Sequence, residues 1–315
     1  MKLLGTHHIT AIAGDPQQNL DFYTQVLGLR FVKRTVNFDD PGSYHFYFGD
    51  NAGMPGTILT FFPWPGARRG SRGNSLVTAT SFAIAPEAIG FWSDRLKREH
   101  VLAELAANRF GDEVLRFTDP DGLLIELIAS ADLNVVDLGF DSDVPREFAL
   151  RGFHAPTLQV AKAEKTMELL TQTLGFAAER EEGDRIRLSV GREAACKLDL
   201  LERPDDPFGN NAAGTVHHIA FRCANDEEQL QWRQKLVDLG YGVSPVRDRQ
   251  YFHSIYFREP NGILFEIATE GPGMAIDEPI QTLGENLMLP PAYESHRNEI
   301  QQALPPISLH RNSSK

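Results

Sequence analysis

Apolar residues follow two alternating spacings along the chain, and the alternation occurs four times. Apolar, strand-like stretches cover residues 7–13, 76–85, 153–160 and 216–224. Each stretch is followed by a segment whose apolar residues fall on one helical face, such as Leu20, Tyr23 and Leu27 in the first. Further strand-like stretches, joined by turns rich in Gly and Pro, complete each repeat. The pattern predicts four successive βαβββ units.

Two short sequences recur in the second half of the chain. Residues 24–28, Thr-Gln-Val-Leu-Gly, resemble residues 171–175, and residues 119–126 resemble residues 259–266. We expect the helix around the first repeat to begin with Asp15 as its N-cap and to end at Gly28, where a left-handed residue belongs. The chain therefore consists of two related halves, and each half contains two of the units.

A short sheet with one helix cannot cover both of its faces, so such units must pair and curl their sheets around a cavity. We predict an α+β fold in which four βαβββ modules form two tandem domains with curled mixed sheets. The predicted parts are an N-terminal domain at 1–135, a linker at 136–150, a C-terminal domain at 151–272 and a wrapping tail at 273–315.

Composition and charge narrow the class of protein. Hydrophobic residues make up 42% of the 315 residues and charged residues 23%, as in a globular protein. The net charge of −12 gives little attraction for a nucleic acid backbone, and no apolar run approaches the roughly 18–20 residues of a membrane span. Without a signal sequence, we expect a cytoplasmic location. Cys196 and Cys223 lie in apolar stretches and should be buried thiols.

The candidate chemistry lies in two histidine doublets, His7-His8 and His217-His218, at the start of the first and fourth opening strands. Adjacent strand residues face opposite sides, so one imidazole of each doublet can point into the cavity. Glu266 lies among five apolar neighbours, where a carboxylate is costly to bury unless it meets a cation or hydrogen-bond donors. Two imidazoles and one carboxylate are the facial triad that suits Fe(II) and leaves metal positions open.

The repeats are compatible with two such triads. His154 is the repeat equivalent of His8, so pairing of the third and fourth units would bring His154 to His218 and Glu266. Pairing of the first and fourth units would bring His8 there instead, and periodicity does not choose between them. Glu126 is the repeat equivalent of Glu266, but the opening strand of its unit has no histidine. We therefore expect no metal beside Glu126.

The four units, over residues 1 to about 275, resemble the vicinal oxygen chelate superfamily. Some segments are similar to ring-cleaving dioxygenases that act on para-hydroquinones, including the dichlorohydroquinone and methylhydroquinone enzymes. These segments are His7-His8-Ile9-Thr10, residues 27–35 (Leu-Gly-Leu-Arg-Phe-Val-Lys-Arg-Thr), Pro55-Gly56-Thr57, Arg151-Gly152-Phe153-His154 and His217-His218.

The resemblance implies that the first and fourth units form the metal cleft. It favours His8, His218 and Glu266 as ligands of Fe(II), with a hydroquinone and dioxygen as the substrates. It also implies roles around the metal for the residues at matching positions, which are His7, Thr10, His217, Arg249 and Tyr256. The strand pattern agrees in part, since Thr10 shares a strand face with His8 and Tyr256 lies across the last hairpin from Glu266. His253 departs from the acidic residue expected at its position.

Two other functions suit the same fold. A glyoxalase-type lyase or isomerase would need a fourth protein ligand, and Thr60 in the equivalent strand of the first unit offers only a hydroxyl. A non-catalytic small-molecule-binding protein would need a cavity but no metal, and the complete triad favours an enzyme. A homo-oligomer is compatible with the sequence.

Overall fold

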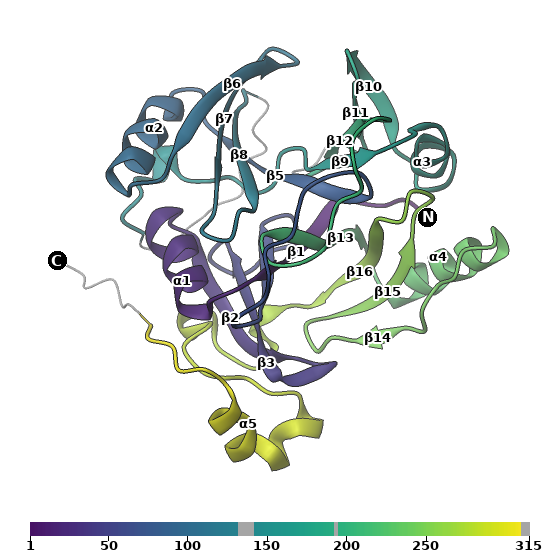
Figure 1. The fold of residues 1–315 in the computed structure, drawn as a ribbon. Coiled ribbons are helices and arrows are strands. Elements are labelled where there is room, and N and C mark those ends of the chain that lie inside the picture. Colours follow the sequence, from purple (N-terminus) through teal and green to yellow (C-terminus); the bar gives the residue numbers. More distant parts are fainter. Residues whose placement is uncertain (132–141, 192–194, 310–315) are drawn as a thin grey trace.

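Each predicted unit folds as βαβββ, and the units pair in two curled, mixed eight-stranded sheets (Figure 1). The computed structural model describes residues 1–131, 142–191 and 195–309. We call the sheet with order β14-β15-β16-β13-β1-β4-β3-β2 the site sheet. Its strands are β1 (Thr6–Ala13), β2 (Arg30–Asn37), β3 (Asp40–Gly49), β4 (Ile58–Pro63), β13 (Thr215–Cys223), β14 (Arg247–Asp248), β15 (Phe252–Arg258) and β16 (Leu264–Pro272).

The other sheet, the second sheet, has the order β10-β11-β12-β9-β5-β8-β7-β6. Its strands are β5 (Leu76–Ile84), β6 (Ala103–Arg109), β7 (Asp112–Thr118), β8 (Leu124–Ala129), β9 (Thr157–Val160), β10 (Ala177–Glu182), β11 (Arg185–Ser189) and β12 (Lys197–Glu202). The site sheet therefore joins the first and fourth units, which confirms the pairing that the resemblance implies, and the second sheet joins the second and third.

Each sheet takes one unit from each half of the sequence, so the halves interlock in space. The predicted domains at 1–135 and 151–272 correspond to the two halves of the sequence and not to the two sheets. This division of the chain remains a prediction. Residues 136–141 of the predicted linker lie outside the described residues. The rest of the linker contains a 3-10 turn (Arg146–Phe148) between the buried side chains of Val144 and Leu150.

The repeated Thr-Gln sequences coincide with an unusual helix geometry. Helix α1 (Pro16–Asp21) has Asp15 as its N-cap, with the carboxylate accepting a hydrogen bond from Gln18 N at 2.8 Å. It continues as a π-helical turn (Phe22–Val26) before Gly28, whose φ is +66°. Helix α3 (Glu164–Glu168) continues in the same way through Leu169–Thr173. Helices α2 (Ala88–Arg98) and α4 (Asp226–Asp238) have no such turn.

The third opening strand is shorter than predicted. The sequence pattern predicts a strand over 153–160, but β9 begins at Thr157. Pro156 has no N–H to donate to a neighbouring strand, which explains why regular pairing starts only after it. His154 therefore precedes the strand, and its backbone N–H donates to Ser81 O at 2.8 Å.

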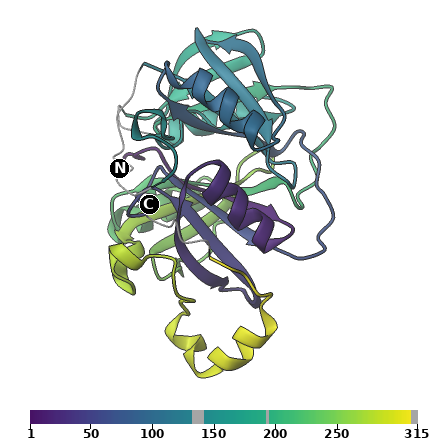
Figure 2. The same ribbon diagram turned by 90° about the vertical axis from the view of Figure 1, so that its left-hand side faces the viewer.

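The tail packs on the outer part of the first unit. Three 3-10 turns (Met274–Ile276, Ile280–Thr282 and Pro291–His296) lead to helix α5 (Arg297–Ala303). Helix α5 lies against β3, at the far end of the site sheet from the second sheet (Figure 2). The fully buried ammonium of Lys33 joins Asp277 and Glu278 at 2.6 and 2.7 Å and so fixes the start of the tail. Residues 310–315 of the predicted tail lie outside the described residues.

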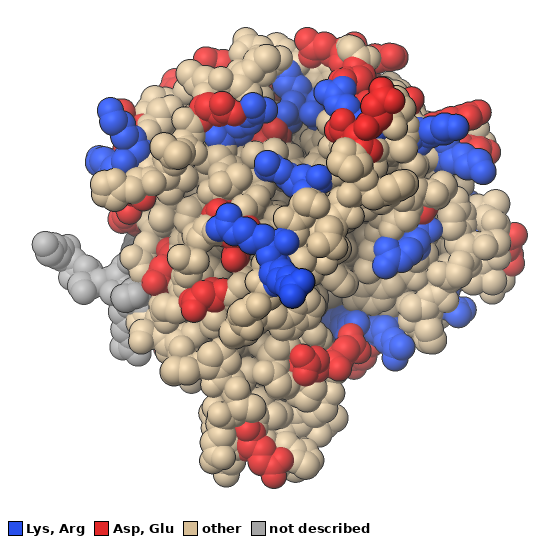
Figure 3. Space-filling view, in the orientation of Figure 1, with Lys and Arg blue, Asp and Glu red and all other residues tan. Residues whose placement is uncertain are grey.

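The surface carries both signs of charge. Lys and Arg side chains alternate with Asp and Glu side chains over the face in Figure 3. None of the helices within the described residues combines the length and the apolar character that a membrane crossing requires. Cys196 and Cys223 are both buried, as predicted from their apolar surroundings.

Candidate metal centre

Three neighbouring strands bring His8, His218 and Glu266 together. His8 lies on β1, His218 on β13 and Glu266 on β16, and β13 pairs with both other strands. His8 Nε2 lies 3.3 Å from His218 Nε2 and 3.3 Å from Glu266 Oε2, and His218 Nε2 lies 2.9 Å from the same oxygen. Within the part of the chain that the structure describes, these residues form the group whose donor atoms suit a metal ion, and His154 is not in it.

The spacing of the three atoms fits one metal ion. Adjacent ligands of an octahedral ion with bonds of about 2.1 Å are about 3 Å apart. The observed separations of 2.9–3.3 Å therefore match one triangular face of an octahedron. Such a face leaves the opposite positions open for other molecules.

The buried negative charge of Glu266 also favours the binding of a cation. Glu266 is fully buried, and its Oε2 faces the two imidazoles while Ser254 donates to its Oε1. Burial raises the pKa of the Glu266 carboxyl, but the contacts with His8 and His218 outweigh burial and hold that pKa well below its usual range. Burial lowers the pKa of His218, which favours the neutral imidazole that a metal ion requires. A buried carboxylate beside two imidazoles is a binding site for a positive ion.

In each doublet the ring of the outer histidine, His7 or His217, contacts the ring of the inner histidine, His8 or His218. His7 Nδ1 lies 2.9 Å from His8 Nδ1, and His217 Nδ1 lies 2.7 Å from His218 Nδ1. On the first strand this contact accompanies a shift in the pairing register with β13 between Thr6 and His8. When the inner imidazole donates through Nδ1–H, its Nε2 presents a lone pair to the centre of the site. Each doublet thus orients one potential ligand.

The second sheet satisfies its equivalent carboxylate without a metal ion. Arg109 donates to both oxygens of Glu126 at 2.5 and 2.6 Å, and Ser81 donates at 2.8 Å. The guanidinium supplies the positive charge that the buried carboxylate needs. His154 is also buried, and neither of its ring nitrogens has a hydrogen-bond partner among the described residues.

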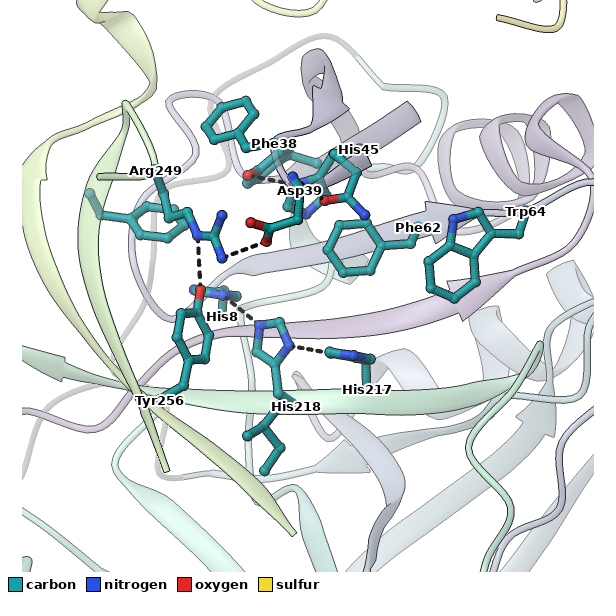
Figure 4. A pocket seen from close by; sticks show the side chains of 14 residues that line it. His8, Phe38, Asp39, His45, Phe62, Trp64, His217, His218, Arg249 and Tyr256 are labelled. Atoms are coloured by element: carbon teal, nitrogen blue, oxygen red, sulfur yellow. Dashed lines mark hydrogen bonds and ion pairs between the residues drawn. The ribbon is translucent and has the colours of Figure 1, made fainter. Parts of the chain in front are cut away.

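A cavity of about 320 Å³ opens beside His8 and His218 (Figure 4). This is at the small end of ligand cavities and suits a single aromatic ring. The aromatic side chains in its wall are Phe38, Tyr47, Phe62, Trp64, Phe252 and Tyr256. Phe62 and Trp64 stack at a centroid distance of 5.8 Å, and Phe62 meets the edge of His217 at 5.7 Å.

Arg249 and Tyr256 form the polar part of the wall. Arg249 Nε donates to Tyr256 Oη at 3.2 Å, and its Nη2 donates to Asp39 Oδ2 at 2.9 Å. Tyr256 is directly opposite Glu266 in the pairing of β15 and β16. Burial raises the pKa of Tyr256, so its hydroxyl keeps the proton at neutral pH. Arg249 is therefore part of the cavity rather than of a solvated turn.

The other residues that the resemblance singles out take different places. His217 lines the cavity, and burial lowers its pKa to about 3. His7 lies behind His8, with its ring 4.9 Å from that of Phe252. Thr10 Oγ1 is hydrogen-bonded to Thr60 Oγ1 at 2.8 Å. His253 points to Asp226 on α4, at 2.6 Å, so its departure from the expected acidic residue does not alter the cavity wall.

The sequence pattern did not identify Asp39, His45 or Tyr47. All three line the cavity. Asp39 belongs to the turn between β2 and β3 and reaches Arg249 across 210 residues of sequence, which no local pattern reports. His45 had a weak signal, since it interrupts the aromatic run Tyr44–Phe48 and shares a strand face with Tyr47.

The fold and the site define the class of protein. Residues 5–127 and 152–267 match the Glyoxalase/Bleomycin resistance protein/Dioxygenase superfamily. The chain belongs to this superfamily, as the four βαβββ units and the triad at their seam predict.

Relatives with known names lie within this superfamily. The chain is 47% identical over 308 residues to the Bacillus subtilis protein named "Putative ring-cleaving dioxygenase MhqO", and the match covers 98% of each chain. It is 33% identical to the Sphingobium indicum protein named "Chlorohydroquinone/hydroquinone 1,2-dioxygenase", over 94% of each chain. A crystal structure described as a "putative dioxygenase from Bacillus subtilis" superposes with a TM-score of 0.94 at 47% identity, covering 98% of this chain and 99% of the other.

Proposed function

We propose that this protein is an iron(II)-dependent dioxygenase that opens the ring of hydroquinone-type aromatic compounds. The observation that carries the proposal is the triad of His8 Nε2, His218 Nε2 and Glu266 Oε2, whose two histidines line an aromatic cavity. The names of the relatives support the same reaction class and the same substrates. Iron(II) held by such a triad has open positions and can bring dioxygen and a phenolate together.

The residues of the chain have separate tasks in this reaction. His7 and His217 orient the inner imidazoles through their Nδ1 contacts. Arg249 presents a half-buried positive charge to the cavity and favours an anionic substrate oxygen or a developing oxyanion there. Tyr256 holds a proton at Oη, within the reach of Arg249, and is the group that can donate it to an oxygen in the cavity.

The aromatic wall selects for a flat substrate and limits water. Phe62, Trp64 and Phe252 offer ring faces and edges against which an aromatic ring can pack. A substrate of one ring displaces water from a space of about 320 Å³ and so strengthens the polar contacts that remain.

A four-ligand lyase or isomerase receives no support from the site. Thr60 is the residue of β4 that faces Thr10 in the strand pairing, and its hydroxyl is hydrogen-bonded to Thr10 and His45. Among the described residues, the ligand group contains three side chains. Iron without zinc or nickel is therefore the expected metal content of the purified protein.

Exposure to air should inactivate the enzyme, and ferrous iron should restore it. Iron with open positions can oxidise to an inert ferric form, so ring cleavage should decline on standing and return after addition of ferrous iron with ascorbate. Oxygen uptake with hydroquinone, measured beside metal analysis, checks this expectation. Ring cleavage that survives exhaustive chelation, with no metal detected, would contradict the proposed function.

A further inference from the structure

A chain of hydrogen bonds runs along the wall of the cavity on the side of β3 and β4. Tyr47 Oη lies 3.0 Å from His45 Nδ1, and His45 Nε2 lies 2.9 Å from Thr60 Oγ1. Thr60 Oγ1 lies 2.8 Å from Thr10 Oγ1. None of these groups belongs to the triad, although His45 and Tyr47 both line the cavity above it.

The strand register places this chain beside the triad. Tyr47 pairs with Thr60, Thr60 with Thr10, and Thr10 with His218, so the four residues form one row across β3, β4, β1 and β13. Successive strands are about 4.8 Å apart, and the curled sheet turns the row around the cavity. Figure 4 shows His45 across the cavity from His218, so a ring bound between them would meet both walls.

The protonation states require His45 to donate a hydrogen bond at one ring nitrogen and to accept one at the other. Burial, followed by the nearby His8 and His218, lowers the pKa of His45 well below its ordinary value, so the imidazole is neutral and has one donor and one acceptor nitrogen. Burial raises the pKa of Tyr47, so its hydroxyl stays protonated. The His45 ring is fixed between Tyr47 and Phe62, with centroid distances of 4.2 and 4.4 Å.

Tyr47 Oη can accept one more hydrogen bond. A tyrosine hydroxyl can donate one hydrogen bond and accept others. Within the described part of the chain, the hydrogen-bond partner of Tyr47 Oη is His45. When Tyr47 donates to His45 Nδ1, its oxygen remains able to accept a hydrogen bond from a molecule in the cavity.

We propose that Tyr47, positioned by His45, binds the second ring oxygen of a para-diol whose first oxygen lies at the triad. The second hydroxyl donates to Tyr47 Oη, Tyr47 donates to His45 Nδ1, and His45 Nε2–H donates to Thr60. A 1,2-diol has its second oxygen beside the first and leaves this bond unmade. The inference rests on the proposed function and deepens it, since it names the residue that selects the para arrangement.

Anaerobic binding titrations of the iron(II)-loaded protein test this proposal. Hydroquinone and phenol differ in the second hydroxyl, and Tyr47→Phe removes only the hydroxyl that would receive it. Wild-type protein should bind hydroquinone about three- to tenfold more tightly than phenol, as expected for one neutral hydrogen bond. Tyr47→Phe should bind the two compounds about equally and should bind phenol like the wild type. His45→Phe, which keeps an aromatic ring but breaks the chain, should reduce the same preference.

Tyr44→Phe is the matched control, because Tyr44 lies on the same strand but donates to Pro305 O in the tail. It should keep the wild-type preference. A preference for hydroquinone that persists unchanged in Tyr47→Phe would overturn the inference and leave the proposed function intact. A wild-type protein that binds neither compound would instead count against the proposed function itself. A variant that weakens both compounds equally would show a structural role for Tyr47 and would also overturn the inference.

Discussion

Replacing His8 by alanine should lower hydroquinone turnover by about three orders of magnitude. Residues that only surround a metal ligand typically change affinity or activity by about 10- to 100-fold, and loss of a ligand itself should cost more. His8 Nε2 lies 3.3 Å from both His218 Nε2 and Glu266 Oε2, so the variant would leave two donors of the triad. Turnover per folded molecule and iron per molecule, measured on the same sample, check this result.

His154→Ala is the matched control for His8→Ala. His154 is the repeat equivalent of His8, but it lies just before β9 of the second sheet, and its ring has no hydrogen-bond partner among the described residues. Its loss should cost about 1–3 kcal/mol of stability, as for an ordinary buried side chain. Turnover per folded molecule should stay within a few-fold of the wild type. An iron-free His154→Ala beside an iron-replete His8→Ala would contradict the site assignment.

Glu266→Gln should abolish iron binding while the protein remains folded. A neutral amide is a poor ligand for iron, and the variant removes the only carboxylate of the triad. The amide has nearly the size of the carboxylate and can still accept the hydrogen bond from Ser254, so the protein should remain folded. Metal analysis and thermal denaturation of the variant test both expectations.

Glu126→Gln should leave iron binding intact and so serves as the control. Its carboxylate is paired with the half-buried Arg109, which the variant leaves with a weaker partner. We expect a loss of about 1–3 kcal/mol in stability, with iron content as in the wild type. If both variants retained equal iron, Glu266 would not be a ligand of the metal.

The fold was predictable because its units repeat. Four cycles of strand, helical face and strands were visible in the apolar pattern, and Asp15 and Gly28 marked the ends of the first helix. Which units share a sheet was not visible, because His8 and His154 occupy equivalent repeat positions. Local periodicity carries no information on pairing over 200 residues, and the resemblance favoured the arrangement found in the structure.

The site was predictable where a residue type was out of place in its strand. Glu266 among apolar neighbours and the two histidine doublets are such residues, and the structure brings their side chains together. Asp39 and Tyr47 had no such signal, because a charged turn residue and a strand tyrosine are ordinary. Tyr47 lies at the cavity because the sheet curves. Asp39 lies there because its turn reaches Arg249.

Oxygen uptake by the iron(II)-loaded protein tests the central claim most directly. Hydroquinone added to this protein should consume one dioxygen per molecule of hydroquinone and give a product whose mass increases by both oxygen atoms. The protein loaded with zinc, and the His8→Ala variant, should consume none above background. Stoichiometric ring opening that requires iron and His8 is the result that we predict. Hydroquinone that stays intact with the iron-loaded protein, or that reacts equally well without His8, would contradict the proposed function.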